Sequence, residues 1–442
     1  MPDLTYNYIR ISSASTPPDF TTFRPNLFAN ANINNDGYVD YEGFVGSVTS
    51  YLPPSAIYSG NGSSPPTTLI DPTKYQFTDN TGKTYQSGIF FSPAINNSGV
   101  SVFAGSGFDF ASSEATASAP TAIISVLDGA INNVAYSSTP FVTIALDPNK
   151  SLNDPSNDVA SGSFVSAPGL NDRGTVAYVA GNSDGTSAIY AKSPRGKLTT
   201  IASTSGNSPF SDFYLGGLDV GRGQGTFAKF TLPGINNYGW VVFNADLKGG
   251  GKGLFASNGR SFKTIVSNTS GSYSYFSLPS INNNGTVAFN AGYTNGREAI
   301  IESTNGNLTT IADNSSGSIF KDFKSDVAIN NQGDVAFLAD LKDGSTAIYS
   351  WSADSGFSKV IAVGQALDGS TVTSLFVSHK GLNDHGHVAF DAVLANGGDE
   401  VFRAEPGYGL QQNSVLSLDG VSTVGLAIFS IVSYYWRHRK GH

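Results

Sequence analysis

Four side chains with oxygen atoms near the start of the sequence follow the spacing of a calcium-binding loop. In the segment NINNDGYVDYEG, Asn32, Asn34, Asp36 and Asp40 occupy positions 1, 3, 5 and 9 around a turn glycine. Position 12 is Gly43, where an EF-hand loop has a bidentate glutamate. Six similar turns recur elsewhere in the chain without these acids. A hairpin turn therefore explains most of the pattern, and a calcium ion held by the four side chains is the alternative.

Two further groups of side chains could act as metal ligands or as catalytic acids and bases. His385 and His387 flank the glycine of the last such turn, with His379 near them in sequence, and imidazoles bind zinc or accept protons. Their alternation places one in a turn and one on a strand, so we favour solvent-facing side chains. Asp246 and Asp340 could form the carboxylate pair of a glycoside hydrolase, but their matching N-A-D-L and L-A-D-L settings favour caps at sheet edges.

The composition indicates which scaffold must hold these residues. Only 13% of the 442 residues are charged, below the roughly 25% usual in soluble domains, while 50 are glycine. A single Met and few Glu disfavour a helical bundle, and a hydrophobic content of 39% is enough for a core. The net charge of -9 argues against a nucleic-acid partner, and the lack of Cys excludes disulfides and thiolate metal sites. We expect an all-β body with no cofactor apart from the calcium alternative.

One nonapeptide recurs seven times and organises the chain. Each copy has an apolar strand end, followed by Asn-Asn/Asp-x-Gly and then by alternating Val and Phe/Tyr. This pattern predicts a β-hairpin whose Gly has a positive φ. The spacings between copies are 62, 75, 65, 46, 48 and 53 residues, which suit propeller blades with loop insertions in the first half. The copies are INNDGYVDY from Ile33, INNSGVSVF from Ile95, LNDRGTVAY from Leu170, INNYGWVVF from Ile235, INNNGTVAF from Ile281, INNQGDVAF from Ile329 and LNDHGHVAF from Leu382.

The strands that accompany each copy predict a closed ring. An A-I-Y-like strand follows each hairpin, and a T-T-I-A-like strand then follows six of the seven, including VTIAL from Val142. The last copy lacks this strand, and the segment from Tyr6 to Ile11 resembles it. We therefore predict a seven-bladed β-propeller over residues 1–407, closed by the N-terminal strand, which removes an open sheet edge. The segment INNVAYSS from Ile131 lacks the Gly and is interpreted as a connection between strands.

The end of the chain has a different composition. A polar linker over 408–420 leads to an uncharged apolar span over 421–436, which we predict to be a transmembrane or anchor helix, and then to a basic cytoplasmic end over 437–442. An apolar segment docked on the propeller is the alternative. The residues expected to contact the membrane are Val421, Leu426, Ile428, Phe429, Ile431, Tyr434, Tyr435, Trp436, Arg437 and Arg439.

The predicted orientation of this anchor places the propeller outside the cytoplasm. The first residues, MPDLTYNYIR, have neither the basic nor the apolar region of a signal peptide. An extracytoplasmic propeller therefore needs a route of export that the sequence does not show. A tail anchor with the propeller facing the cytosol is the alternative.

The repeats and the tail together resemble bacterial surface proteins with tandem N-x-x-G-x-V-A-F repeats and a choice of C-terminal anchor. Three copies match the repeat in full, beginning at Asn282, Asn330 and Asn383. Members of this group often carry a Pro-Glu-Pro motif before the apolar span, and only Glu405 and Pro406 are present here. This difference favours a plain membrane anchor over processing by a sorting enzyme. The resemblance implies export and surface display, and it implies no activity.

The sequence favours binding over catalysis, because no blade departs from the repeat with several reactive groups. We predict a non-enzymatic, membrane-anchored propeller that acts as a binding or scaffold module for a protein or glycan partner. An accessory subunit of a larger membrane complex and an exported hydrolase acting on polysaccharide are the alternatives. Loops of the first half carry the aromatic residues expected to contact a partner, which are Tyr51, Tyr58, Phe108, Phe110 and Tyr214.

Overall fold

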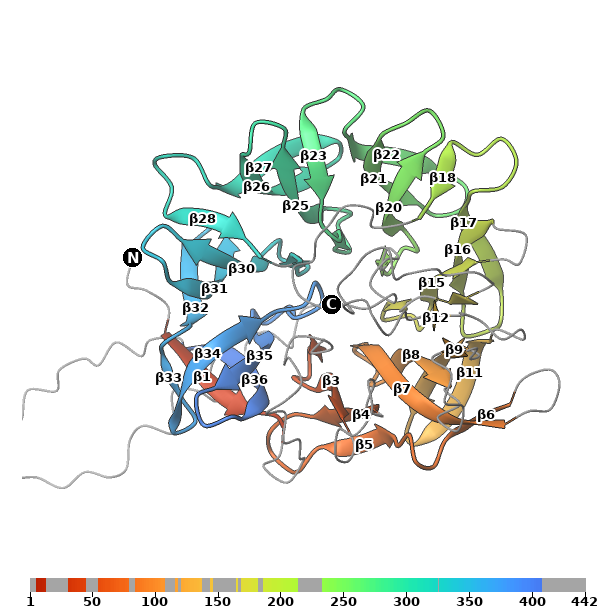
Figure 1. The fold of residues 1–442 in the computed structure, drawn as a ribbon, viewed down its shortest axis with the longest axis horizontal. Helices are drawn as coiled ribbons and strands as arrows, with labels where there is room; N and C mark the ends of the chain where they lie inside the picture. The colour runs from red at the N-terminus through yellow and green to blue at the C-terminus, as the bar shows by residue number, and fades with distance from the viewer. Residues whose placement is uncertain are drawn as a thin grey trace, which may run out of the picture. The chain divides into compact units, whose positions relative to one another are not determined.

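Seven antiparallel sheets of four or five strands stand around a central axis in the computed structural model of the chain (Figure 1). Each sheet contains one copy of the nonapeptide, so the described residues form the predicted all-β, seven-bladed propeller. No helix occurs among these residues, and so none of them forms a helix that could cross a membrane. The structure describes residues 5–12, 31–44, 55–78, 84–107, 116–117, 121–136, 144–145, 164–165, 168–181, 186–213, 233–324 and 326–407.

The first three blades contain the strands β2 to β17. Blade 1 has β2 (Asn32–Ile33), β3 (Val39–Phe44), β4 (Ser55–Gly60) and β5 (Thr67–Ile70). Blade 2 has β6 (Gln76–Thr78), β7 (Thr84–Ile95), β8 (Ser101–Gly107), β10 (Thr121–Leu127) and β11 (Ala130–Tyr136), while β9 (Thr116–Ala117) and β12 (Ile144–Ala145) form a separate pair. Blade 3 has β13 (Phe164–Val165), β14 (Gly169–Leu170), β15 (Val176–Gly181), β16 (Ser187–Lys192) and β17 (Leu198–Ser203).

The last four blades are more regular. Blade 4 has β18 (Phe210–Asp212), β19 (Gly234–Ile235), β20 (Val241–Leu247), β21 (Lys252–Ser257) and β22 (Phe262–Ser267). Blade 5 has β23 (Tyr273–Phe276), β24 (Ser280–Ile281), β25 (Val287–Tyr293), β26 (Glu298–Thr304) and β27 (Asn307–Asp313). Blade 6 has β28 (Phe320–Phe323), β29 (Ala328–Ile329), β30 (Val335–Leu341), β31 (Thr346–Ser352) and β32 (Gly356–Ala362). Blade 7 has β33 (Ala366–Leu367), β34 (Ser370–Phe376), β35 (Val388–Leu394), β36 (Asp399–Gly407) and β1 (Thr5–Arg10).

The nonapeptide forms the turn that leads out of the innermost segment of each blade. In blade 5 the Oδ1 atom of Asn282 accepts the backbone N–H groups of Asn284 and Thr286, both at 3.0 Å. Gly285 donates its N–H to the carbonyl oxygen of Asn282 at 3.1 Å and has a φ of +80°. A side chain with a Cβ rarely adopts this backbone conformation, which explains the glycine of the repeat. The turn is therefore specified by the repeat sequence itself.

The Val-Ala-Phe part of the repeat packs against both neighbouring blades. Val335 and Phe337 of β30 lie in a buried cluster with Ala288 of blade 5. Ala336, between them in sequence, lies in the next buried cluster with Phe390 of blade 7. Successive side chains of a strand point to opposite faces, so both faces of β30 are buried. This explains why the strand reads as a continuous apolar run with a small residue in the middle.

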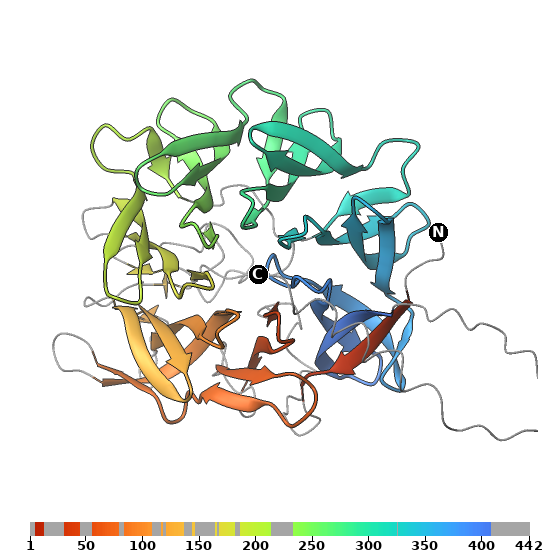
Figure 2. The same ribbon diagram turned by 180° about the vertical axis from the view of Figure 1, so that it is seen from behind.

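Strand β1 joins the two ends of the propeller at blade 7. It pairs antiparallel with β36, from Thr5 opposite Gly407 to Arg10 opposite Phe402. The guanidinium group of Arg10 also forms an ion pair with Glu400 at 2.5 Å. Figure 2 shows the red N-terminal strand at the outer edge of the blue blade. The closure predicted from the segment Tyr6 to Ile11 is thereby confirmed.

The outermost strand of blade 2 differs from the prediction. The sequence pattern places VTIAL from Val142 there, but the strand that pairs with β10 is β11, which contains Ile131. The residues Ile144–Ala145 of the predicted strand form β12 and pair with β9 instead. Asp128 and Gly129 both have a positive φ, as a two-residue type I′ hairpin requires. This Asp-Gly turn folds β11 directly back onto β10, and it decides which segment completes the blade.

Candidate functional site

The first Asn of each repeat forms a closed ring of hydrogen bonds around the propeller axis. In each blade its Nδ2 atom donates to the backbone oxygen of the corresponding Asn in the next blade, at 2.9 to 3.2 Å. Its Oδ1 atom accepts N–H groups of its own turn. The ring consists of Asn34, Asn96, Asn171, Asn236, Asn282, Asn330 and Asn383.

The second Asn or Asp of each repeat forms a parallel ring. Its backbone N–H donates to the side-chain Oδ1 of the corresponding residue in the next blade, at 2.8 to 3.0 Å. The members are Asn35, Asn97, Asp172, Asn237, Asn283, Asn331 and Asp384. The two rings give the conserved spacing of the Asn pair a structural role.

The four residues of the predicted calcium loop have very different surroundings. Asn34 belongs to the first ring, and Asn32 donates from Nδ2 to the carbonyl oxygen of Pro93. Asp36 is exposed, whereas Asp40 is fully buried opposite Asn32 in the sheet, and burial raises its pKa to about 6. Among the described residues, no group of three acidic or His side chains gathers in a way that could hold a metal ion. Calcium at these positions stays a prediction.

The histidines and carboxylates considered from the sequence lie at separate places. His385 is exposed in its turn and His387 is half-buried on the adjoining strand segment, with their ring centroids 5.7 Å apart. Asp246 lies 3.8 Å from the Lys252 ammonium group in blade 4. Asp340 of blade 6 accepts a hydrogen bond from Thr346 Oγ1 at 2.6 Å and is 3.1 Å from the ammonium group of Lys324. Each carboxylate thus lies beside a lysine of its own blade, and the role of a cap stays a prediction.

The other predicted contact residues fall mostly outside the described part of the chain. The residues outside the described part are Tyr51, Phe108, Phe110 and Tyr214, together with the whole predicted anchor over 421–436. Tyr58 lies in β4, where its half-buried ring stacks on Tyr41 with centroids 5.5 Å apart. Its ring therefore packs within blade 1. A partner contact by these residues stays a prediction.

A pocket of about 210 Å³ between blades 4 and 5 brings together aromatic and amide side chains. Tyr238 and Trp240 form part of its wall, and Tyr238 is 67% exposed, the highest value among the large hydrophobic side chains of the described residues. The Lys263 ammonium group lies 4.7 Å from the centroid of the Trp240 ring. Across the pocket, Asn284 and Asn305 supply amide groups, the latter from a tight turn in which it has a φ of +52°.

The composition of this pocket suits binding. Cations lie over both aromatic rings, Lys263 at 4.7 Å from the Trp240 centroid and Arg173 at 5.6 Å from the Tyr238 centroid, and amides and Ser303 supply hydrogen-bonding groups around them. The described residues that line it include no Asp, Glu or His. Sequence reasoning missed it, although one signal was present: the repeat INNYGWVVF alone has aromatic residues at both variable positions of the turn, Tyr238 and Trp240.

Comparisons with known proteins give a family and an architecture. The profile of a family described as "Family of unknown function (DUF7453)" matches residues 14–312. No curated protein matches the sequence. Among solved structures, the chain is similar to an alpha-L-arabinanase of Penicillium chrysogenum, at 11% identity and a TM-score of 0.38 over 90% of this chain and 98% of the other. It is also similar to the BP39L lectin of Burkholderia pseudomallei, at 9% identity and a TM-score of 0.40 over 84% and 98%. Values this low assign neither an activity nor a ligand.

Proposed function

Because the chain belongs to DUF7453, a family of unknown function, its role has to be argued from the site, and we propose that the propeller is a non-enzymatic module that binds a neutral glycan. The pocket between blades 4 and 5 is the proposed binding site. The observation that carries the proposal is the pairing of Trp240 and the exposed Tyr238 with facing amides in one pocket. The C–H face of a sugar ring packs on an aromatic ring, and its hydroxyl groups exchange hydrogen bonds with amides.

The experiment that tests this role is a glycan-array screen of the purified full-length protein, followed by calorimetry with the glycans retained. We expect Trp240→Ala and Tyr238→Ala to weaken binding about tenfold or more, because each removes an aromatic face. Tyr38→Ala is the matched control, since Tyr38 occupies the same turn position in blade 1 as Trp240 in blade 4. The proposal fails if no glycan binds, or if the pocket variants bind as the control does. A protein partner lost on Trp240→Ala would make the pocket a protein contact instead.

The same proposal includes attachment to a membrane through residues 421–436, with the propeller outside the cytoplasm. Support for it comes from the sequence: an uncharged apolar span, aromatic residues at its end and a basic terminus. Deleting residues 421–442 should move the protein from the membrane fraction to the soluble fraction. Protease added to intact cells should cleave the full-length propeller. Retention of the truncated protein on membranes would contradict the anchor, and protection of the full-length propeller would contradict its orientation.

A further inference from the structure

A second cavity, of about 160 Å³, lies on the propeller axis and is lined by residues of all seven blades. Its wall consists of the innermost segments and the turn residues, including members of both hydrogen-bond rings. A volume of this size holds several water molecules or a small organic molecule. The cavity is separate from the pocket between blades 4 and 5, so the inference drawn from it is independent of the proposed glycan site.

Lys380 of blade 7 reaches across this cavity. Its Nζ atom donates to the backbone oxygen of Pro168 in blade 3 at 2.8 Å, although the two residues are 212 positions apart. Blades 2 to 5 have Pro at the position equivalent to Lys380, so the amine is a departure from the repeat. No carboxylate of the described residues lies within 4.0 Å of its nitrogen. An ammonium group has three donors, and only one of them has an acceptor among the described residues.

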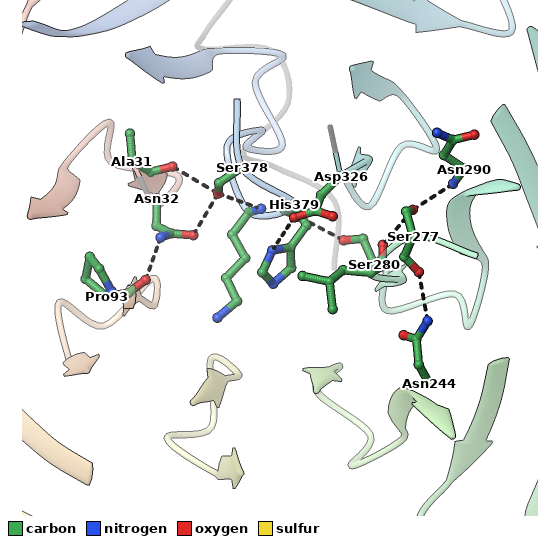
Figure 3. A network of polar contacts seen from close by, with 12 residues as sticks. Ala31, Asn32, Pro93, Asn244, Ser277, Ser280, Asn290, Asp326, Ser378 and His379 are labelled. Carbon is green, nitrogen blue, oxygen red and sulfur yellow. Dashed lines mark hydrogen bonds and ion pairs between the residues drawn. The ribbon is translucent and has the colours of Figure 1, made fainter. Parts of the chain in front are cut away.

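His379, next in sequence, provides a second unused polar atom at the same cavity. The side chain is only 8% exposed, and its Nε2 atom has no hydrogen-bond partner among the described residues. Its Nδ1 atom lies 3.9 Å from Oδ2 of Asp326 in blade 6. Figure 3 shows His379 between Asp326 and Ser280, whose hydroxyl donates to the His379 carbonyl oxygen at 3.0 Å. A buried polar atom without a partner in the protein is where a ligand atom would bind.

The charges around the cavity leave Lys380 as its cationic group. Burial lowers the pKa of His379 to about 3 and raises the pKa of Asp326 to about 7, so the imidazole is neutral at neutral pH. Burial also lowers the pKa of Lys380 to about 7. The two acids of the second ring, Asp172 and Asp384, both accept N–H groups of neighbouring Asn residues. Their oxygens are therefore engaged, whereas the amine and the imidazole have donors to spare.

We propose that the central cavity binds a small carboxylate, with one oxygen on Lys380 Nζ and the other within reach of His379 Nε2. The carboxylate supplies a counter-charge to the partly buried ammonium group, which has no carboxylate of the described residues within 4.0 Å. The Nδ2 atoms of Asn97 and Asn283, which line the same cavity and have no acceptor among the described residues, are available to hydroxyl groups of the ligand. The carboxylate could belong to a free acid or to an acidic sugar, and the test separates these two sources.

The test compares charged and neutral ligands of the same shape on the full-length protein. Acetate should bind, as measured by calorimetry or NMR titration, and acetamide should bind at least tenfold more weakly. Raising the pH from 6 to 8 should weaken acetate binding about tenfold, because an amine with a pKa near 7 loses its charge over that range. A free acid is the source if D-glucuronate binds no better than acetate. An acidic sugar is the source if D-glucuronate binds much more tightly than both acetate and D-glucose.

Variants give an independent reading. Lys380→Met keeps the length of the side chain and removes the charge, so it should abolish the preference for acetate over acetamide, and His379→Gln should weaken acetate binding severalfold. Lys359→Met, which changes an exposed lysine of β32, is the control and should bind acetate normally. Circular dichroism of each variant shows whether it is folded. Equal binding of acetate and acetamide by the wild-type protein would overturn the proposal without any variant, as would normal acetate binding by folded Lys380→Met.

Discussion

Asn383 of blade 7 donates a hydrogen bond from Nδ2 to the backbone oxygen of Asn34 in blade 1 at 2.9 Å. The two residues are 349 positions apart, yet the bond repeats the one that joins each pair of consecutive blades. Blade 7 also meets blade 1 through Ala389, which packs with Val39 and Tyr41 as the repeat alanines do elsewhere. The first and last blades are thus joined by the same contacts as neighbours in sequence.

Removing one member of the Asn ring should destabilise the whole propeller. In Asn383→Ala, the N–H groups of His385 and His387 lose their acceptor, and the carbonyl oxygen of Asn34 loses its donor. We expect the free energy of unfolding to fall by about 2–4 kcal/mol, measured by chemical denaturation. Asn396→Ala is the control: Asn396 is exposed and accepts only the N–H of Gly398, so its loss should cost about 1 kcal/mol or less. Equal effects would show that the ring adds no stability.

Deleting residues 1–12 should open the propeller at blade 7. Strand β36 would then have a free edge of unpaired N–H and C=O groups, a template for pairing with another chain. Tyr8 would also be lost, together with its hydrogen bond to the carbonyl oxygen of Val360 at 2.6 Å and its edge contact with Phe390. We expect a lower melting temperature and oligomers in size-exclusion chromatography. Deletion of residues 1–4, which precede β1, is the control. A monomer with an unchanged melting temperature would show that β1 does not stabilise the closure.

Enlarging the small residue of the Val-Ala-Phe strand should push two blades apart. Ala336 is fully buried and lies in the same buried cluster as Phe390 of blade 7. Ala336→Leu adds volume where the packing has no room, so the free energy of unfolding should fall by about 1–3 kcal/mol. Thr309→Leu makes an enlarging change at an exposed position of β27 and should have a much smaller effect. If the two variants are equally stable in thermal melts, the alanine does not set the blade spacing.

The repeats made the fold predictable because every step of the architecture is local and recurs. The Asn-x-Gly turn and the apolar run after it recur from Ile33 to Leu382, and the strand missing after the last copy is visible at Tyr6 to Ile11. The error in blade 2 arose where two segments competed for one position. The similarity of VTIAL to the repeat favoured the segment from Val142 as the outermost strand. The Asp128-Gly129 turn instead folds β11, which comes earlier in the chain, back onto β10.

The binding sites were much harder to predict, because they depend on contacts between blades. Trp240 and Asn305 belong to different blades and meet only because blades 4 and 5 stand side by side. Lys380 and Pro168 meet across the axis, a relationship that depends on the number of blades in the ring. Sequence can show that Trp240 and Lys380 depart from the repeat, but the residues opposite them follow from the closed geometry.

A partly buried carboxyl group, that of Asp326, should make the stability of the propeller depend on pH. Burial raises the pKa of Asp326 from 3.8 to about 7. Between about pH 4 and pH 7 the carboxyl group is therefore protonated in the folded protein and ionised in the unfolded chain. The free energy of unfolding therefore falls as the pH rises through that range. Above pH 7 the full destabilisation by the ionised carboxylate is present. Asp326→Asn removes the titration. It should raise the free energy of unfolding by about 2–4 kcal/mol at pH 8 and change it little at pH 4.

Urea denaturation at pH 4, 6 and 8 measures this effect, with Asp354→Asn as the control at an exposed position. The control should show no gain that grows with pH. A loss of stability in Asp326→Asn would be explained by the contact between Asp326 and His379. If Asp326 were ionised and paired with a protonated His379, the Asn variant would be less stable than the wild type near neutral pH, because it would leave a buried imidazolium without its partner. A gain that grows with pH shows instead that Asp326 is protonated in the folded protein at low pH and ionises at the expense of stability as the pH rises, with no protonated His379 to pair with it.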